Sequence, residues 1–358
     1  GVRHAARQAS TVPLFAQGFG QLPFDVAALR AVPYALGPEG TPSNAEVDRR
    51  AIVARLRAAR NGGTDSPVFR LVDGFPDLQR LKTDVFRDRV AYSAEIKKKL
   101  ASARRAGADS VRAVAGALGQ PVGETDAAVV IDLFLSYRAV KAWDDMIALV
   151  EKMAPPLAAS VMVREQLALA LNRAGRGEEA EDVLTALLAQ RGSSSETFGI
   201  LGRVYKDRWE AALKAGDAAL ARGLLDKAID AYRRGFEADW RDAYPGINAV
   251  TLMELRDPPD PRREELVCVV NYAVERRVAA GKPDYWDHAT RVELAVLARD
   301  EARARAALGE ALAAVRESWE PETTARNLRL VREARERRGE TMPWATEVEN
   351  ALVARGKR

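Results

Sequence analysis

Leucines recur at a fixed interval in the middle of this chain, at positions 133, 167 and 201, so that each stands 34 residues after the one before. Four residues after each leucine comes another large side chain, at Tyr137, Leu171 and Tyr205. Residues four apart lie on the same face of a helix, so each segment predicts a helix with one packed face. A chain with this spacing is expected to repeat one structural unit.

A period of 34 residues is typical of the tetratricopeptide repeat, whose unit is a pair of antiparallel helices. In that unit a leucine, a small residue and an aromatic line the first helix, as Leu201, Gly202 and Tyr205 do here. One pair cannot bury its apolar face alone, so pairs stack into a solenoid with a concave groove, which favours binding over catalysis. The expected repeat positions are Leu133, Tyr137, Leu167, Leu171, Leu201, Gly202, Tyr205, Ala228 and Tyr232.

The predicted fold class is mainly α, a tetratricopeptide-like α-solenoid of antiparallel helix pairs over residues 122–358. The third pair begins at 196–215, where the spacing is interrupted at Lys214 and restored at Ala228, and this alanine-rich insertion predicts longer helices. The last pair is a sixth repeat or a polar cap. The remaining pairs are expected at 125–139 with 143–153, 158–174 with 178–190, 244–255 with 263–280, 286–298 with 301–317, and 322–338 with 344–355.

The first 75 residues follow another pattern and predict a small partial α/β segment. Short apolar runs at 11–16 and 32–36 predict strands, 24–29 predicts a short helical piece, and 46–60 predicts a helix. Pro13 and Pro33 would lie at strand starts or edges, because proline cannot donate to a strand ladder. Residues 76–121 are expected to be a helical connector with a break at Gly107.

Charge and hydropathy argue against two classes of partner, nucleic acids and membranes. The formal net charge is +4 over 358 residues, and acidic and basic residues alternate along the helices. This pattern predicts solvated faces, so we expect no nucleic-acid partner. No apolar run approaches the roughly 18 residues of a membrane span, and no secretory signal opens the chain, so we expect a cytoplasmic protein without membrane contact. A homo-oligomer is compatible with the sequence.

Residues for catalysis are scarce. His4 has no sequence-local partner, and Asp287 and His288 are neighbours that would point about 100° apart on a helix. The G-x-G at 18–20 has Pro23 where a third glycine would stand, and no phosphate-binding loop is present. The single cysteine, Cys268, lies in an apolar run and is expected to be a buried thiol. We therefore predict no enzyme activity, no cofactor and no metal site.

Several segments resemble the central regulatory region of apoptosis signal-regulating kinases, in order and in approximate spacing. They are Val129 to Arg138, Trp143 to Glu151, Gly202 to Asp207, Ala231 to Glu237, Gly246 to Asn248 and Tyr285 to Asp287. The resemblance implies a tetratricopeptide-like solenoid, called the TRAF-binding region in that family, which regulates a kinase through protein contacts. It covers about residues 80 to 330. The implied function is a scaffold that binds a protein or peptide in stress or defence signalling. The alanine- and arginine-rich composition looks bacterial.

The N-terminal segment resembles the second half of a TIR-like or deoxyribosyltransferase-like domain. The matching segments are Gly1 to Ala5, Pro23 to Val26 and Val32 to Tyr34. The resemblance implies that residues 1–75 are a partial Rossmann-like segment, and that the functional glutamate of such domains would precede Gly1. The alternative function is therefore the regulatory half of a nucleotide-binding or nucleotide-hydrolysing protein.

Partner-binding candidates come from a second ladder at the repeat spacing. Arg138, Asn172 and Lys206 occupy one position in three successive repeats, and Arg203 and Asn248 complete the candidate set. Because first helices line the groove, these side chains could hold a peptide that bears carboxylates. Alternatively, they satisfy carbonyls or acidic neighbours between helices. The aromatic residues of the later pairs are expected to fill the core between repeats, namely Tyr232, Phe236, Tyr244, Tyr285 and Trp286.

Overall fold

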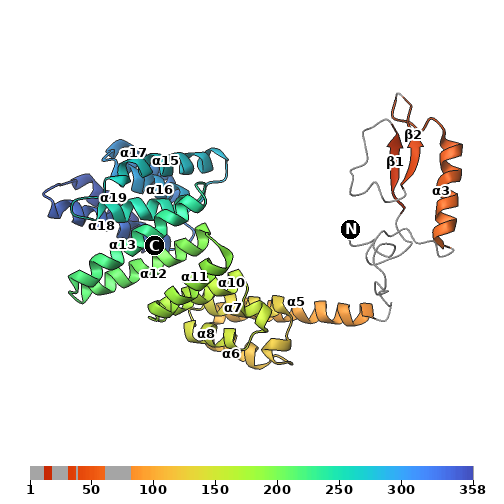
Figure 1. Ribbon diagram of the computed structural model, residues 1–358, viewed down its shortest axis with the longest axis horizontal. Helices are drawn as coiled ribbons and strands as arrows, with labels where there is room; N and C mark the ends of the chain where they lie inside the picture. The colour runs from red at the N-terminus through yellow and green to blue at the C-terminus, as the bar shows by residue number, and fades with distance from the viewer. Residues whose placement is uncertain (1–11, 18–30, 38, 61–81, 358) are drawn as a thin grey trace. The chain divides into compact units, whose positions relative to one another are not determined.

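The computed structural model describes residues 12–17, 31–37, 39–60 and 82–357 (Figure 1). The chain divides into two compact units, Gly1–Ala94 and Glu95–Arg358. Helix α5 (Lys82–Ala106) crosses that boundary. The division into domains at residues 75 and 121 stays a prediction.

The first unit contains a small parallel sheet. Strand β1 (Leu14–Gln17) pairs with β2 (Val32–Ala35), with Leu14 opposite Val32, and helix α3 (Ala45–Arg60) contacts β2. The amide of Val32 donates to the carbonyl of Pro13 at 2.9 Å. Two strands and a helix form the α/β piece that the apolar runs predict, whereas the helical piece expected at 24–29 lies outside the described residues. The assignment of this piece as Rossmann-like stays a prediction.

The second unit begins with helices that continue into the repeat core. After α5 comes α6 (Ala108–Gly116), and the break falls at Gly107, whose φ of 107° favours glycine. Ile96 and Leu100 of α5 and Val111 of α6 are buried in the same cluster as the first repeats. A 3-10 turn, η1 (Val122–Glu124), then leads into the helix pairs.

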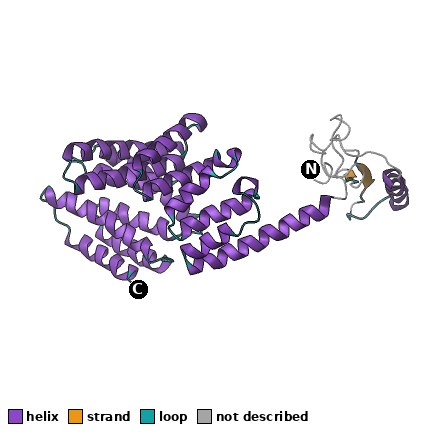
Figure 2. Ribbon diagram, turned by 90° about the horizontal axis from the view of Figure 1, so that it is seen from below, coloured by secondary structure: helices purple, strands orange, loops and turns teal. Residues whose placement is uncertain are grey.

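Antiparallel helix pairs make up the rest of the described chain, as the 34-residue spacing predicts (Figure 2). A short helix α9 (Pro155–Ala158), opened by its prolines, separates the first two pairs. The alanine-rich insertion lengthens the third pair to 20 and 21 residues. The pairs are α7 (Ala127–Ala139) with α8 (Trp143–Glu151), α10 (Val161–Arg173) with α11 (Gly177–Arg191), α12 (Ser195–Lys214) with α13 (Ala218–Ala238), α14 (Ala243–Glu254) with α15 (Arg262–Ala279), α16 (Tyr285–Leu297) with α17 (Glu301–Ala314), and α18 (Trp319–Arg337) with α19 (Pro343–Gly356).

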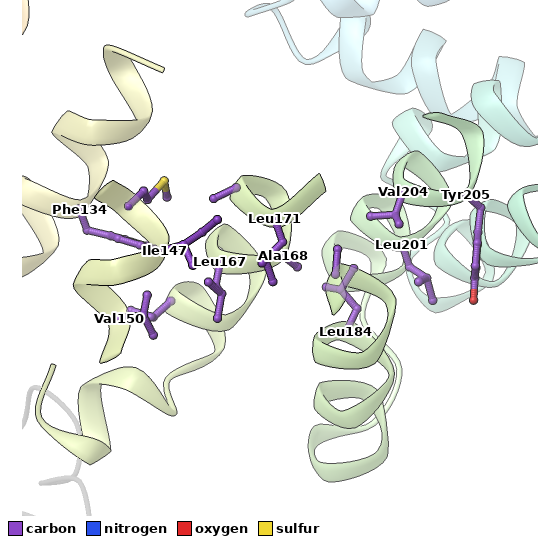
Figure 3. Close-up of a cluster of buried hydrophobic side chains, with 14 of the residues drawn as sticks. Phe134, Ile147, Val150, Leu167, Ala168, Leu171, Leu184, Leu201, Val204 and Tyr205 are labelled. Carbon is purple, nitrogen blue, oxygen red and sulfur yellow. The ribbon is translucent and has the colours of Figure 1, made fainter. Parts of the chain in front are cut away.

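The leucines of the 34-residue ladder lie in one continuous apolar core, of which Figure 3 shows the part around Leu167 and Leu201. Leu133, Leu167 and Leu201 are 1%, 8% and 5% exposed. Gly202 permits a close helix contact, because a Cβ at that position would lie 2.6 Å from Cγ of Tyr232 in α13. Glycine at this position therefore lets the two helices of the third pair approach each other.

The first helices of the third and sixth pairs, α12 and α18, contact each other. Lys206 of α12 donates to the side-chain oxygen of Asn327 in α18 at 2.8 Å, across 121 residues of sequence. Arg326 of α18 also forms an ion pair with Glu210 of α12. Polar contacts therefore join α12 directly to α18, and the groove expected along the solenoid stays a prediction.

A buried arginine of α18, Arg335, forms hydrogen bonds with helices α14 and α16. Arg335 of α18 is 2% exposed; its Nε donates to Oε1 of Glu254 in α14 at 2.7 Å, and its other nitrogens donate to the carbonyls of Val296 and Leu297. Arg338 donates to the same glutamate oxygen at 2.6 Å. The last pair is thus joined to the preceding pairs by charged contacts.

The expectation for Cys268 is wrong. Its thiol is exposed and lies 3.6 Å from the carbonyl of Glu264, one turn earlier in α15. The apolar run around it turns through a full helical circle, and only Val270 of its nearest apolar neighbours is buried. Among the helices of the described chain, none has the length and apolar character needed to cross a lipid bilayer.

Candidate partner-binding cleft

A cleft of about 110 Å³ lies where α12, α14, α16 and α18 converge. Its floor is a chain of buried polar side chains, one from each of these helices: Lys206, Asn248, Glu293 and Asn327. The ammonium of Lys206 donates to Asn327 Oδ1 at 2.8 Å and to Asn248 Oδ1 at 3.4 Å. Asn327 Nδ2 in turn donates to Glu293 Oε1 at 3.2 Å. The side-chain amide of Asn327 therefore links the ammonium of Lys206 to the carboxyl of Glu293.

Burial shifts the pKa values of both ionisable groups of the floor in the direction that favours their uncharged forms. It raises the pKa of the Glu293 carboxyl to about 7, although the hydrogen bond from Asn327 and the charge of Lys206 act in the opposite direction. Burial, helped by the positive charge of Arg203, lowers the pKa of the Lys206 ammonium to about 8. Desolvation thus outweighs the mutual attraction of the two groups, which are linked only through Asn327.

Two aromatic residues, Tyr244 and Trp286, line the cleft, and Trp319 adjoins it through its contact with Trp286; these three residues are called the rim below. Tyr244, Trp286 and Trp319 stand in the first turns of α14, α16 and α18 and are 47%, 37% and 54% exposed. The rings of Trp286 and Trp319 lie 5.6 Å apart between centroids. Three successive first helices thus present an exposed aromatic side chain at the same end.

Side-chain caps fix where two of these helices begin. Asp242 accepts from the amide of Tyr244 at 3.1 Å at the start of α14. At the start of α16, Asp284 accepts from the amides of Trp286 and Asp287, and Asp287 accepts from the amide of Asp284 at 3.0 Å. This reciprocal arrangement is a capping box, which satisfies amides that a helix leaves free at its first turn. Tyr244 and Trp286 therefore lie in first turns whose backbone is held by side-chain caps.

The expectation that all five aromatic residues of the later pairs fill the core is partly wrong. Tyr232, Phe236 and Tyr285 are fully buried, but Tyr244 and Trp286 form the rim. Both are only partly exposed: the ring of Tyr244 packs edge-on against Tyr232 at 6.1 Å between centroids, and Trp286 contacts Tyr285 and Trp319.

Two arginines line the walls and are held by carboxylates. Arg203 of α12 donates to Asp207 Oδ1 at 2.9 Å, one turn along the same helix. Arg277 of α15 donates to Asp287 Oδ1 at 2.6 Å, and half of its side chain remains exposed. The charged groups of the walls are therefore paired with each other.

The structure brings together three of the five predicted partner-binding residues. Arg203, Lys206 and Asn248 line the cleft, whereas Arg138 and Asn172 do not. Arg138 is exposed and donates to Gln166 at 2.7 Å, and Asn172 donates to Asp207 at 2.8 Å. Lys206 is only 3% exposed and is bonded to Asn327 and Asn248, whereas Arg138 is exposed, so these residues do not form one exposed ladder. Of the three ladder residues, Asn172 bonds to an acidic neighbour, and Arg138 and Lys206 bond to side-chain amides; their role in binding a partner stays a prediction.

Sequence reasoning missed Glu293, Asn327 and Trp319. One signal was available, since Asn327 follows Glu293 by 34 residues, the same interval that joins Lys206 to the earlier ladder positions. A lone glutamate in the apolar run of α16 was a second signal. In the described ranges, His288 contacts Glu310 at 3.1 Å, and no group of three His, Cys, Asp or Glu side chains is arranged to hold a metal ion.

Two curated proteins are similar to part of this chain. Mitogen-activated protein kinase kinase kinase 15 of Mus musculus is 31% identical over 188 residues, which is 49% of this chain. Mitogen-activated protein kinase kinase kinase nsy-1 of Caenorhabditis elegans is 28% identical over 219 residues, 56% of this chain. The aligned part spans only 14% of the length of each relative.

Among solved structures, a tetratricopeptide repeat protein of Thermus thermophilus is 15% identical with a TM-score of 0.43, covering 57% of this chain and 99% of that one. Another, from Parabacteroides merdae, is 13% identical with a TM-score of 0.40, covering 76% and 99%. The sequence profile of the MAP3K TRAFs-binding domain matches residues 1–350. A match over nearly the whole length, together with stacked helix pairs, shows that this chain belongs to the MAP3K TRAFs-binding domain family.

Proposed function

We propose that this chain is a non-catalytic regulatory module that holds a segment of a partner protein at the aromatic rim of the cleft. Membership of a TRAFs-binding family and a tetratricopeptide-like fold both indicate a protein-interaction region. The observation that carries the finer proposal is the row of exposed aromatic residues, Tyr244, Trp286 and Trp319, above a polar floor.

Aromatic residues at helix starts suit a binding role for energetic reasons. Each large ring can bury about 150–250 Å² against a partner, and tryptophan and tyrosine are enriched at the residues that dominate binding energy. Trp286 and Trp319 already contact each other and belong to capped or tightly packed helices, so little side-chain freedom is lost when a partner binds. A partner segment would cover the rim and place one group in the cleft.

The signalling context follows from the relatives. The family description names TRAFs, and the two similar animal proteins are kinases several times longer than this chain. We propose that this chain likewise regulates a larger signalling protein through protein contacts, in stress or defence signalling.

Capture of the partner tests the proposed surface. The chain would be immobilised as wild type, as the double variant Trp286→Ser/Trp319→Ser, and as Tyr272→Ser, and each would be exposed to lysate of its source cells. Tyr272 is the matched control, because it is 67% exposed on the second helix α15. We expect a protein that wild type and Tyr272→Ser retain and that the double variant loses.

The captured protein would then be purified and titrated against the three forms. We expect the double variant to weaken binding by about 2 kcal/mol or more, as for truncated aromatic residues at the centre of an interface. Equal affinity of all three forms would place the partner elsewhere on the molecule and reject the rim as the binding surface.

A further inference from the structure

One oxygen in the floor of the cleft has no partner. Glu293 is 6% exposed and its Oε1 accepts from Asn327, but its buried Oε2 has no hydrogen-bond partner among the described residues. An ionised carboxylate accepts several hydrogen bonds, and a buried acceptor without one is unfavourable. The floor is therefore incomplete at Glu293 and lacks a donor.

The cations around this carboxylate are engaged by other groups. Lys206 donates to Asn327 and Asn248, Arg203 pairs with Asp207, and Arg277 pairs with Asp287. No ion pair within 4 Å joins Glu293 to any of the described basic residues. A donor to Glu293 Oε2 would then be a water molecule or a group of a bound ligand.

The shape and lining of the cleft limit what that donor can be. A volume of about 110 Å³ corresponds to roughly three or four water molecules, so it admits a small head group. Trp286 also lines the cleft, about two turns before Glu293 in α16, and aromatic faces attract cations. We infer that the cleft accepts a cationic side-chain group, the ammonium of a lysine or the guanidinium of an arginine, with Glu293 Oε2 as its acceptor. This inference rests on the proposed function, in which a partner segment covers the rim.

The ionisation of Glu293 supports the same ligand. Because burial raises the pKa of this carboxyl to about 7, a bound cation stabilises the charged form, so affinity rises with pH through this range. Loss of the Lys206 charge above its pKa of about 8 acts in the same direction. The charged groups that line the cleft or lie close to it are Arg203 and Lys206 of α12, Asp242 before α14, Arg277 of α15, Asp287 of α16, and Arg326 of α18 with its partner Glu210.

Two small probes with matched shapes test the inference on the full chain. Nα-acetyl-lysine methylamide carries the ammonium, and its Nε-acetylated form has lost the charge and kept the chain length. Binding would be followed by NMR through the indole N–H of Trp286, assigned with Trp286→Phe. We expect the charged probe to shift this signal with an affinity at least about tenfold higher than the acetylated one, and the difference to increase between pH 6 and pH 8.

Glu293→Gln removes the charge with nearly the same shape, and Glu264→Gln is the control, since that glutamate side chain is 82% exposed on α15. We expect Glu293→Gln to abolish the preference for the charged probe and Glu264→Gln to retain it. Equal binding of the two probes to wild type, or no shift with either, overturns the inference and leaves a water-filled cleft. Since the probes need no partner, these results are independent of whether the rim captures a protein.

Discussion

Gly202 shows how a single missing side chain sets the distance between two helices. A Cβ at this position would lie closer to Tyr232 than real Cβ contacts allow, and that tyrosine ring is fully buried between helices. The ring cannot move away without disturbing the core, because protein interiors are close-packed. The leucines of the ladder could be identified from sequence as core positions, whereas the need for glycine depends on which ring lies opposite.

We expect Gly202→Ala to destabilise the chain by about 1–3 kcal/mol, the usual range for overpacking a core. Gly223→Ala is the control, because it lies in helix α13 with open space around its Cβ position. There the better helix propensity of alanine is expected to stabilise by up to about 1 kcal/mol. Urea unfolding of both variants measures the difference, and two variants of equal stability would contradict the steric account.

Glu293 makes stability depend on pH. Its folded-state pKa of about 7 lies above the ordinary value of 4.5, so between these values the folded state binds more protons than the unfolded state. The stabilisation is therefore full below about pH 4.5 and is lost as the pH rises through 7. We expect the unfolding free energy of wild type to decline relative to Glu293→Gln between pH 5 and pH 7.5, measured by urea denaturation. A constant difference between the two across this range would show that Glu293 titrates normally.

At the scale of helices, the pattern of the sequence predicts most of what is observed. Helix pairing follows from the 34-residue spacing, and the expected ends agree with the observed ones to within a few residues, as for 178–190 against Gly177–Arg191. The outward position of Tyr244 and Trp286 could not be predicted, because it depends on where each helix starts relative to its neighbours. The prediction for Cys268 was wrong for a similar reason, since an apolar run on a helix does not reveal which side packs against the rest of the protein.

The pair α10 and α11 provides a test at this scale. Leu167→Asp places a charge in the core of the pair and should cost about 3 kcal/mol or more, enough to lower the helical signal at moderate temperature. Arg176→Glu, in the turn between these helices, breaks only an exposed contact with Glu179 and should change stability by less than about 1 kcal/mol. Thermal unfolding followed by circular dichroism compares them; similar midpoints would mean that Leu167 does not support the stack.

For the molecule as a whole, the repeat period predicts stacking but not how far the stack curves. Curvature accumulates from small rotations between neighbouring pairs, and these depend on side-chain sizes at each junction. The contact between α18 and α12 therefore could not be predicted from the sequence. This contact also explains why the cleft residues were predicted only in part, since Lys206 acquires its partner Asn327 through it, and Asn327 in turn donates to Glu293.

Arg326→Glu should open this closure, because it places a second negative charge beside Glu210, which is largely buried. We expect faster amide hydrogen exchange in α18 and α19, with α7 to α11 unchanged. Arg241→Glu makes the same charge change at an exposed arginine that pairs only with nearby Asp239. Unchanged exchange in α18 of the Arg326 variant would indicate that the apolar contacts alone hold the last pair.

The hydrogen bond between Lys206 and Asn327 also has a kinetic consequence. Repeat proteins ordinarily fold through contacts between adjacent units, which are local and form quickly. This bond joins positions 121 residues apart, so the chain must lose loop entropy before the contact can form. The final helices should therefore dock in a late, slow phase of refolding, and once docked they should unfold together with the third pair as one cooperative block.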